Sequence, residues 1–320
     1  MFLPVKADFA LPRFPILTVL ICLICFGVFA KQQSDWEEFG MAIDRFCNSS
    51  SRSHIEQMVF DRIAASQNMN ACGDIMYTIT SDPARGESEV IAEMAAKIRP
   101  LTGFKTEDSR EYVRQMLEEE TRRFNILVPP DPDEGLAYYT GSWNPITMLT
   151  SSFAHGDWGH ILFNLIFFFA FAATVEVLVG PLWYVAFVLV DSWFIGLTGS
   201  MAAAAAGQHY WTLGLSGVVM GMMGLFAYLL PRGKIKCYYF FIIVFGSIAV
   251  PGWMLTAWYL GGDIITLFTR DNHGTVNVLA HVMGGIGGYL FGLLFLREIR
   301  KDAEHTQDAL ERVDREKRFR

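Results

Sequence analysis

The stretch AHVMGGIGGYLFG (280–292) places a glycine at every fourth position of one helix face, just after a single histidine. A second apolar stretch, GLSGVVMGMMG (214–224), has three glycines on one face directly after a serine. Stripes of small residues let the backbones of two membrane helices approach closely. We therefore expect these two helices to pack face to face, which would bring Ser216 and His281 within hydrogen-bond reach.

The composition is that of a polytopic membrane protein. Of the 320 residues, 52% are hydrophobic and only 18% are charged, which is too apolar for an ordinary soluble domain. No Lys or Arg occurs between Arg123 and Arg232, as a hydrocarbon environment demands. Apolar runs separated by turn residues predict an all-α bundle of six transmembrane helices. The expected spans lie near 14–30, 146–178, 182–206, 213–230, 237–260 and 277–296.

Charge and hydropathy divide the chain into four parts. Residues 1–30 form an N-terminal stub with the first transmembrane anchor, and 31–142 form a polar helical insertion with a linker. Residues 143–296 hold five further spans, and 297–320 form a charged tail. The fold class expected is therefore a six-helix bundle with a helical extramembrane insertion between its first and second helices.

The first apolar run and the placement of positive charge bear on topology. Val28-Phe29-Ala30 resembles a signal-peptide cleavage site, but we favour an uncleaved anchor. Lys and Arg lie before the first span, between the fourth and fifth, and after the sixth. This pattern predicts that both termini are cytoplasmic and that 31–142 lies outside, where an external client or regulator could bind.

Within the insertion, Glu107 to Leu127 has apolar residues at helical spacing, which predicts an amphipathic helix. Further helices are expected near 35–47, 53–66 and 88–99, and the proline-rich segment 129–135 is expected to be a linker. Two interpretations of its cysteines stay open. Cys47 and Cys72 form a disulfide if the compartment is oxidising, or else remain reduced and buried.

Ionisable and strongly polar side chains are costly inside a bilayer, so each is a candidate functional group. They are His155, Asp157, His160, Asn164, Glu176, Asp191, Ser216 and His281. His160 and Asn164 are four residues apart, so a helix presents both as donors toward one point. This is an oxyanion-hole arrangement, and the alternative is a pair that bonds across packed helices.

The segment Gly214-Leu215-Ser216-Gly217 opens an expected helix with a glycine on either side of the Leu-Ser pair. These glycines would let backbone and substrate approach the hydroxyl closely. An imidazole beside that hydroxyl could take its proton and make it nucleophilic. The alternatives are plain helix packing at the glycines and a structural hydrogen bond at His281.

Taken together, His-x-x-x-Asn, Gly-x-Ser-Gly and Ala-His-x-x-Gly on successive helices resemble the rhomboid family of intramembrane serine proteases. The resemblance runs from about 143 to 296, and HILFN (160–164) and GLSGVV (214–219) are close to bacterial members. It implies that Ser216 attacks the peptide carbonyl and that His281 serves as base and then acid, without a third, acidic member. His160, Asn164 and the Ser216 backbone N–H would then hold the oxyanion.

The resemblance also implies supporting roles. Gly214, Gly217, His155 and Met220 would support the site, and Met220 stands where many bacterial members have a Tyr that packs on the catalytic imidazole. Glu176 matches a position where the family often has a structural acid. Asn144 follows Trp143 where many members have Trp-Arg, which leaves the anchoring of that loop open. The family uses no acid at the position of Asp191, so we expect no catalytic role for it.

The implied activity is cleavage of single-pass transmembrane proteins near the outer face of a bacterial inner membrane, without a cofactor, a metal or a nucleic-acid partner. A zinc protease needs His-Glu-x-x-His, whereas His155 and His160 have the wrong spacing and no such Glu. A transporter lacks support, because no paired broken helices occur in corresponding halves. The remaining alternative is a catalytically silent rhomboid-like protein that binds membrane clients.

Overall fold

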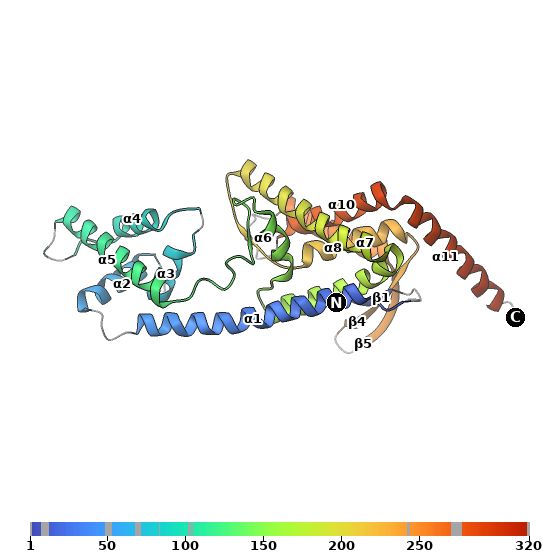
Figure 1. Ribbon diagram of the computed structural model, residues 1–320, viewed down its shortest axis with the longest axis horizontal. Helices are drawn as coiled ribbons and strands as arrows, with labels where there is room; N and C mark the ends of the chain where they lie inside the picture. The colour runs from blue at the N-terminus through green and yellow to red at the C-terminus, as the bar shows by residue number, and fades with distance from the viewer. Residues whose placement is uncertain are drawn as a thin grey trace. The chain divides into compact units, whose positions relative to one another are not determined.

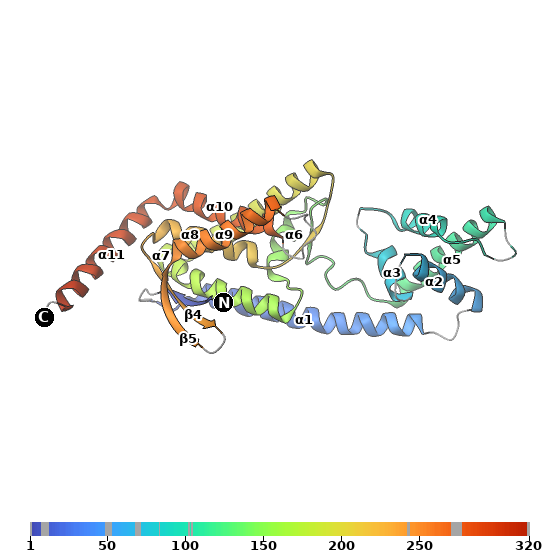
Figure 2. The same ribbon diagram turned by 180° about the vertical axis from the view of Figure 1, so that it is seen from behind.

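The computed structural model divides the chain into two compact units. One unit comprises Met1–Ala30 and Gly135–Arg320, and the other comprises Lys31–Glu134 (Figures 1 and 2). The structure describes residues 2–7, 13–48, 53–67, 72–82, 84–101, 103, 105–241, 244–269 and 277–318.

The first unit consists mainly of apolar helices. Its helices after the linker are α6 (Pro145–Thr150), η1 (Ser151–Phe153), α7 (Trp158–Ala206), α8 (Ser216–Leu229), α9 (Gly252–Thr269), α10 (Val278–Phe295) and α11 (Arg297–Arg318). The long helix α7 is interrupted at Gly180, where φ is 77°, and Pro181 follows. A residue with positive φ cannot continue a right-handed helix, so α7 consists of two helical segments.

Three helices in the described part of the chain are long and apolar enough to cross a membrane: α1 (Ile16–Cys47), α7 and α10. The helix α8 is apolar but shorter. The mostly helical fold is thus confirmed, whereas the count of six spans stays a prediction.

The expectation of an all-α fold is wrong for the segment that precedes α9. Strands β4 (Lys234–Phe241) and β5 (Val244–Pro251) form an antiparallel hairpin, and β1 (Phe2–Ala7) pairs antiparallel with β4 (Figure 1). The span expected at 237–260 is therefore wrong in its first half. Hydrophobicity alone does not distinguish a strand from a helix in an apolar run. The run that begins at 237 is rich in the aromatic and β-branched residues typical of strands.

A second, two-stranded sheet pairs β2 (Tyr138–Tyr139) with β3 (Trp211–Thr212). Beside it, the Ser200 hydroxyl donates to the Thr140 carbonyl at 2.8 Å and the Tyr210 N–H donates to the Thr140 hydroxyl at 3.0 Å. These bonds fix the chain that enters α6 against the chain that leaves α7.

The core of this unit surrounds α8, whose residues from Gly217 to Phe226 are all buried. The ring of Phe226 meets that of Phe171 edge to face, with centroids 5.5 Å apart. On α1, Phe29 is fully buried and packs edge to face on Trp158 at 4.9 Å. The apolar half of α1 is therefore part of this core.

Among its described residues, the second unit contains helices joined by turns and irregular segments, and no strand. It contains the C-terminal part of α1, then α2 (His54–Gln67), α3 (Cys72–Thr80), α4 (Glu87–Lys97) and α5 (Thr106–Leu127). The amphipathic helix expected at 107–127 is confirmed as α5, and 129–135 contains no helix. The helix α3 was not predicted, because it is short and lies among polar residues.

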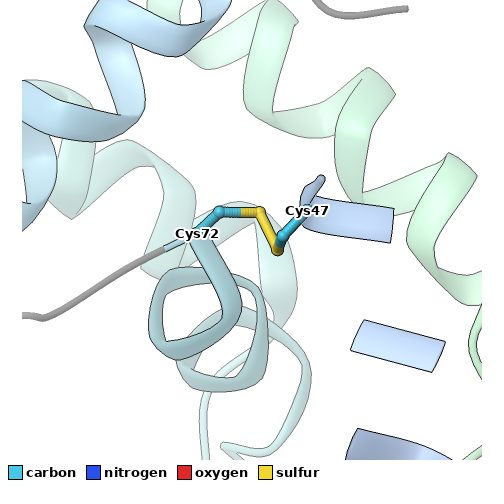
Figure 3. The surroundings of a disulfide bond; sticks show 2 residues. All are labelled: Cys47 and Cys72. Atoms are coloured by element: carbon cyan, nitrogen blue, oxygen red, sulfur yellow. A yellow bond between two sulfur atoms is a disulfide. The ribbon is translucent and has the colours of Figure 1, made fainter. Parts of the chain in front are cut away.

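A disulfide joins Cys47 at the end of α1 to Cys72 at the start of α3 (Figure 3). The sulfurs are bonded across a sequence separation of 25 residues. The structure therefore agrees with the disulfide-bonded interpretation of Cys47 and Cys72 rather than the reduced one. Cys22, Cys25 and Cys237, by contrast, are free.

Candidate active site

A cavity of about 400 Å³ lies in the first unit, between the β2–β3 sheet and helices α7, α8 and α10. Its walls include His160, Asn164, Ser216 and His281. The structure thus brings together the residues that the sequence singled out on separate helices. Gly214 and Gly217 also line this cavity.

The glycine faces of α8 and α10 meet as the sequence predicted. A Cβ atom added to Gly284 would overlap the Gly217 carbonyl oxygen, and one added to Gly288 would overlap the Gly221 carbonyl oxygen. At the cavity end of this contact, a Cβ on Gly217 would lie 3.3 Å from the Ala280 carbonyl oxygen. The residues next to Ser216 and His281 in sequence are therefore in backbone contact.

Ser216 is the first residue of α8. The residue before it, Leu215, has no side-chain acceptor, so no N-cap side chain occupies the first-turn N–H groups. Gly214, two residues before Ser216, has φ of 118°, and its N–H donates to the Ser151 carbonyl at 2.8 Å. The turn into α8 thus depends on a backbone conformation that favours glycine.

Close approach also requires a glycine at this turn. A Cβ on Gly214 would lie 2.6 Å from His160 Nε2 and 3.8 Å from Asn164 Nδ2. Both side chains therefore reach the backbone that leads into Ser216.

The helix α7 positions these two donors. Asp157 caps its N-terminus by accepting a hydrogen bond from the His160 N–H at 2.8 Å. The Gly156 N–H donates to His160 Nδ1 at 3.5 Å, a long bond that favours the tautomer with its proton on Nε2. The buried Asn164 Nδ2 has no hydrogen-bond partner among the described residues. An unsatisfied buried donor beside a cavity suits a developing oxyanion.

His155 packs against His160. It is buried, its Nδ1 lies 3.3 Å from the Phe153 carbonyl, and its ring meets that of His160 edge to face at 5.2 Å.

His281 lies in the first turn of α10. Asn277 caps this helix, since its Oδ1 accepts from the Ala280 N–H at 3.1 Å, and its Nδ2 donates to the Thr212 hydroxyl at 3.0 Å. The histidine Nδ1 lies 3.0 Å from a carboxyl oxygen of Asp263, on α9. Sequence reasoning missed both Asn277 and Asp263.

Each of these residues left a signal in the sequence. Asn277 is a common N-cap residue four positions before the histidine, at the start of an apolar run. Asp263 is the one charged residue between Gly252 and Thr269. The expected span ended at 260, so this carboxylate was not counted among the polar groups of the membrane.

Met220 and Glu176 are not among the residues that line the cavity. Met220 is buried in α8, one turn after Ser216. Glu176 accepts hydrogen bonds from the Leu17 N–H at 2.9 Å and from the Thr18 N–H and hydroxyl at 2.7 Å each. It therefore caps the start of α1, a structural arrangement that suits an anion at a helix N-terminus.

Asp191 is buried between two helices. Added Cβ atoms on Gly221 and Gly287 would both overlap its carboxyl oxygens, and neither oxygen has a hydrogen-bond partner within the described residues. It is not one of the cavity's lining residues.

The loop that contains Trp143 and Asn144 is held by polar contacts. Asn144 Oδ1 accepts from the Ile146 N–H at 2.9 Å and so caps α6. Trp193 Nε1 donates to the Pro145 carbonyl at 3.0 Å and ties α6 to α7. An asparagine at position 144 thus has a role of its own in this loop.

No group of three or more His, Cys, Asp or Glu that could hold a metal ion occurs among the residues that the structure describes. The groups that line the cavity include the hydroxyl of Ser216, the imidazoles of His160 and His281, and the amide of Asn164. Such a set can perform nucleophilic catalysis at a carbonyl.

Comparison with known proteins agrees with this geometry. Residues 142–298 match the family described as the Rhomboid domain. Rhomboid protein 1, mitochondrial, of Saccharomyces cerevisiae is 25% identical over 182 residues, which cover 51% of this chain and 46% of that protein. The chain therefore spans about half the length of this curated relative, at 46%. With its apolar helices, the matched domain makes this an integral membrane protein that belongs to the rhomboid family.

Proposed function

We propose that this protein is an intramembrane serine endopeptidase in which Ser216 is the nucleophile and His281 its base. The observation that carries the proposal is the backbone contact between α8 and α10. It places both side chains at one cavity, together with the donors of His160 and Asn164. An unactivated serine needs such a base, and the oxyanion needs such donors.

The steps follow from these positions. Ser216 Oγ attacks the carbonyl carbon of the scissile peptide bond while its proton passes to His281 Nε2. The resulting oxyanion accepts hydrogen bonds from His160 Nε2, Asn164 Nδ2 and the Ser216 backbone N–H. His281 then gives the proton to the leaving amine nitrogen as the C–N bond breaks, and water hydrolyses the acyl-enzyme by the same route.

We infer that the substrates are single-pass transmembrane proteins. A membrane helix satisfies its own backbone hydrogen bonds, so a peptide bond becomes accessible only where the helix unwinds. Small or helix-destabilising residues near the cleavage site favour this unwinding.

In the orientation that we propose, six spans place both termini in the cytoplasm of a bacterium and the cavity toward the outer face of its inner membrane. The register of the first sheet supports this, because Lys6 of β1 pairs with Lys236 of β4. The N-terminal strand and the basic segment after α8 therefore lie on one side, as the distribution of positive charge requires. The helical unit Lys31–Glu134 would then lie outside, where it could bind a client or regulator.

The proposal is tested with the purified full chain in liposomes and a model transmembrane substrate. We expect cleavage by the wild type and none by Ser216→Ala or His281→Ala. Ser247→Ala and His305→Ala are matched controls, because both positions are exposed and distant in sequence from the cavity residues. A fluorophosphonate probe should label the wild type at Ser216 and leave Ser216→Ala unlabelled.

Cleavage that persists in Ser216→Ala would refute the proposal. Binding of the substrate by the wild type, without cleavage or labelling, would instead identify a catalytically silent client-binding protein.

The oxyanion donors have a separate test. Removing one such donor costs about 10²- to 10³-fold in kcat, so we expect Asn164→Ala to lower kcat on that order. Because Asn164 contacts the oxyanion more strongly than the ground-state carbonyl, KM should change little. An unchanged kcat in Asn164→Ala would show that Asn164 does not donate to the oxyanion.

A further inference from the structure

The proposed mechanism leaves one group beside its histidine unused, the carboxylate of Asp263. Asp263 Oδ2 lies 3.0 Å from His281 Nδ1, and the two side chains keep only 20% and 14% of their exposure. A charge so largely removed from water is costly unless it is paired. The imidazole is the partner that the structure provides.

The position of Asp263 follows from the packing of α9. Thr256, Leu260 and Asp263 recur at helical spacing, so they share one face of α9. The Thr256 hydroxyl donates to the Met223 carbonyl of α8 at 3.1 Å. A Cβ on Gly285 would lie 2.6 Å from Leu260 Cδ1, so Leu260 fits directly against the glycine face of α10.

Asp263 meets α10 one turn further along this contact. Along α10, His281 lies four residues before Gly285, and along α9, Asp263 lies three residues after Leu260. The pairs Leu260–Gly285 and Asp263–His281 are therefore one helical turn apart in the same antiparallel run of contacts. The contact between Asp263 and His281 is therefore set by the packing of two helices rather than by one flexible side chain.

The chemistry of the two groups determines which ring nitrogen carries the proton. An ionised carboxylate can only accept hydrogen bonds, so His281 Nδ1 must be the donor. The lone pair of the neutral ring then lies on Nε2, as a general base for Ser216 requires.

We propose that Asp263 is a positioning residue that holds His281 in its productive tautomer and orientation, an inference that rests on the proposed protease function. As the Ser216 proton moves to Nε2, the imidazolium that forms is stabilised by the carboxylate, which stays ionised throughout. The site then contains a serine, a histidine and an aspartate, in place of the unassisted Ser-His pair implied by the resemblance.

A purely structural role for Asp263 makes different predictions. The same hydrogen bond also ties α9 to α10, and a tether of this kind would affect stability without a selective effect on the reaction. The test must therefore separate proton transfer from helix packing.

The first arm measures the rate of Ser216 labelling by a fluorophosphonate, together with kcat and KM, in the full chain. We expect Asp263→Asn to lower the labelling rate and kcat by about 10-fold or more, because proton transfer by a positioned base contributes about 10²- to 10⁴-fold. KM should change little. Asp263→Glu keeps the charge and should retain more activity than Asp263→Asn. Thr266→Ala, three residues further along α9, is the matched control and should behave as the wild type.

Melting temperatures complete this arm. Wild-type labelling by Asp263→Asn would overturn the proposal. So would equal defects in Asp263→Glu and Asp263→Asn that match their losses in melting temperature, because that result describes a tether.

The second arm does not depend on activity. In the Ser216→Ala background with ¹⁵N-labelled histidine, NMR should show the proton of His281 on Nδ1, and Asp263→Leu should abolish this preference. A proton on Nε2 in the parent would overturn the inference. If the wild type neither cleaves nor is labelled, the proposed function fails, while this arm still decides whether Asp263 holds the ring.

Discussion

The two compact units bury their helices in different ways. In the unit of Met1–Ala30 and Gly135–Arg320, α8 and α10 touch through glycine backbones. In Lys31–Glu134, large side chains such as Ile63, Ile75 and Leu117 fill the space between helices, and a disulfide closes the chain.

We infer that the difference reflects the solvent of each unit, which is lipid for the first unit and water for the second in the proposed topology. Lipid tails are as apolar as leucine, so membrane helices associate through close van der Waals contact and hydrogen bonds rather than through apolar burial. In water, by contrast, each Å² of buried apolar surface contributes about 25 cal/mol. Close backbone contact also serves the proposed catalysis, because only glycines bring the helices of Ser216 and His281 this near.

The largest effect is expected from Gly288→Leu, at the contact between α8 and α10. Its Cβ would overlap the Gly221 carbonyl oxygen, a backbone atom that cannot move aside. We expect a loss of stability of about 3 kcal/mol or more, together with loss of Ser216 labelling. Thermal unfolding in detergent measures the first effect.

Gly262→Leu on α9 is the matched control, because no atom of the described residues lies within 4 Å of an added Cβ at that position. Equal behaviour of the two variants would show that backbone contact does not hold α8 against α10.

In the other unit, the largest effect should come from Cys47→Ser. The bridge spans 25 residues, and loss of such a bridge costs about 2–4 kcal/mol. We expect faster limited proteolysis within 31–134 and unchanged labelling of Ser216. Cys22→Ala, at a free cysteine of the first unit, should leave proteolysis at the wild-type rate. If Cys47→Ser resisted proteolysis as well as the wild type, the disulfide would not be needed for the stability of this unit.

A smaller effect is expected from Glu176→Gln. The carboxylate accepts three hydrogen bonds at the start of α1. In glutamine, the NH₂ group would replace one accepting oxygen and would face a backbone N–H donor. A hydrogen bond to a charged group contributes about 1.5–3 kcal/mol, so we expect a loss of that order in detergent unfolding. Glu38→Gln, at an exposed position of α1, is the control. Similar melting temperatures for both variants would contradict the capping role.

The smallest effect should come from Arg114→Met. Arg114 pairs with Glu111 at 2.7 Å and Glu118 at 2.8 Å on the surface of α5. Exposed ion pairs contribute little, because water and salt screen them. We expect a change in melting temperature too small to resolve. A clear drop would show that surface charge, in addition to the apolar core, stabilises this unit.

Much of this architecture could be predicted from local pattern. The periodic glycines of 214–224 and 280–292 predicted the α8–α10 contact, and the spacing of His160 and Asn164 predicted that both donors reach one point. The amphipathic pattern of 107–127 predicted α5. Periodicity of this kind depends only on helix geometry, so one sequence is enough to read it.

The β4–β5 hairpin was predicted as helix, because an apolar run has the same hydropathy in either conformation. Alternation of Lys234 and Lys236, with aromatic and β-branched residues after them, was the available signal. Strand pairing depends on partners elsewhere in the chain, here β1.

Hydropathy, residue spacing and motifs were enough to predict a mostly helical membrane protein and to single out the serine, the histidine and the two donors proposed for its site. The acid that faces His281 could be found in the fold alone. Asp263 and His281 are 18 residues apart on different helices, and their contact depends on the rotation of α9 against α10. Hydropathy and spacing describe each helix alone, whereas rotation is set by the fit of Leu260 against Gly285.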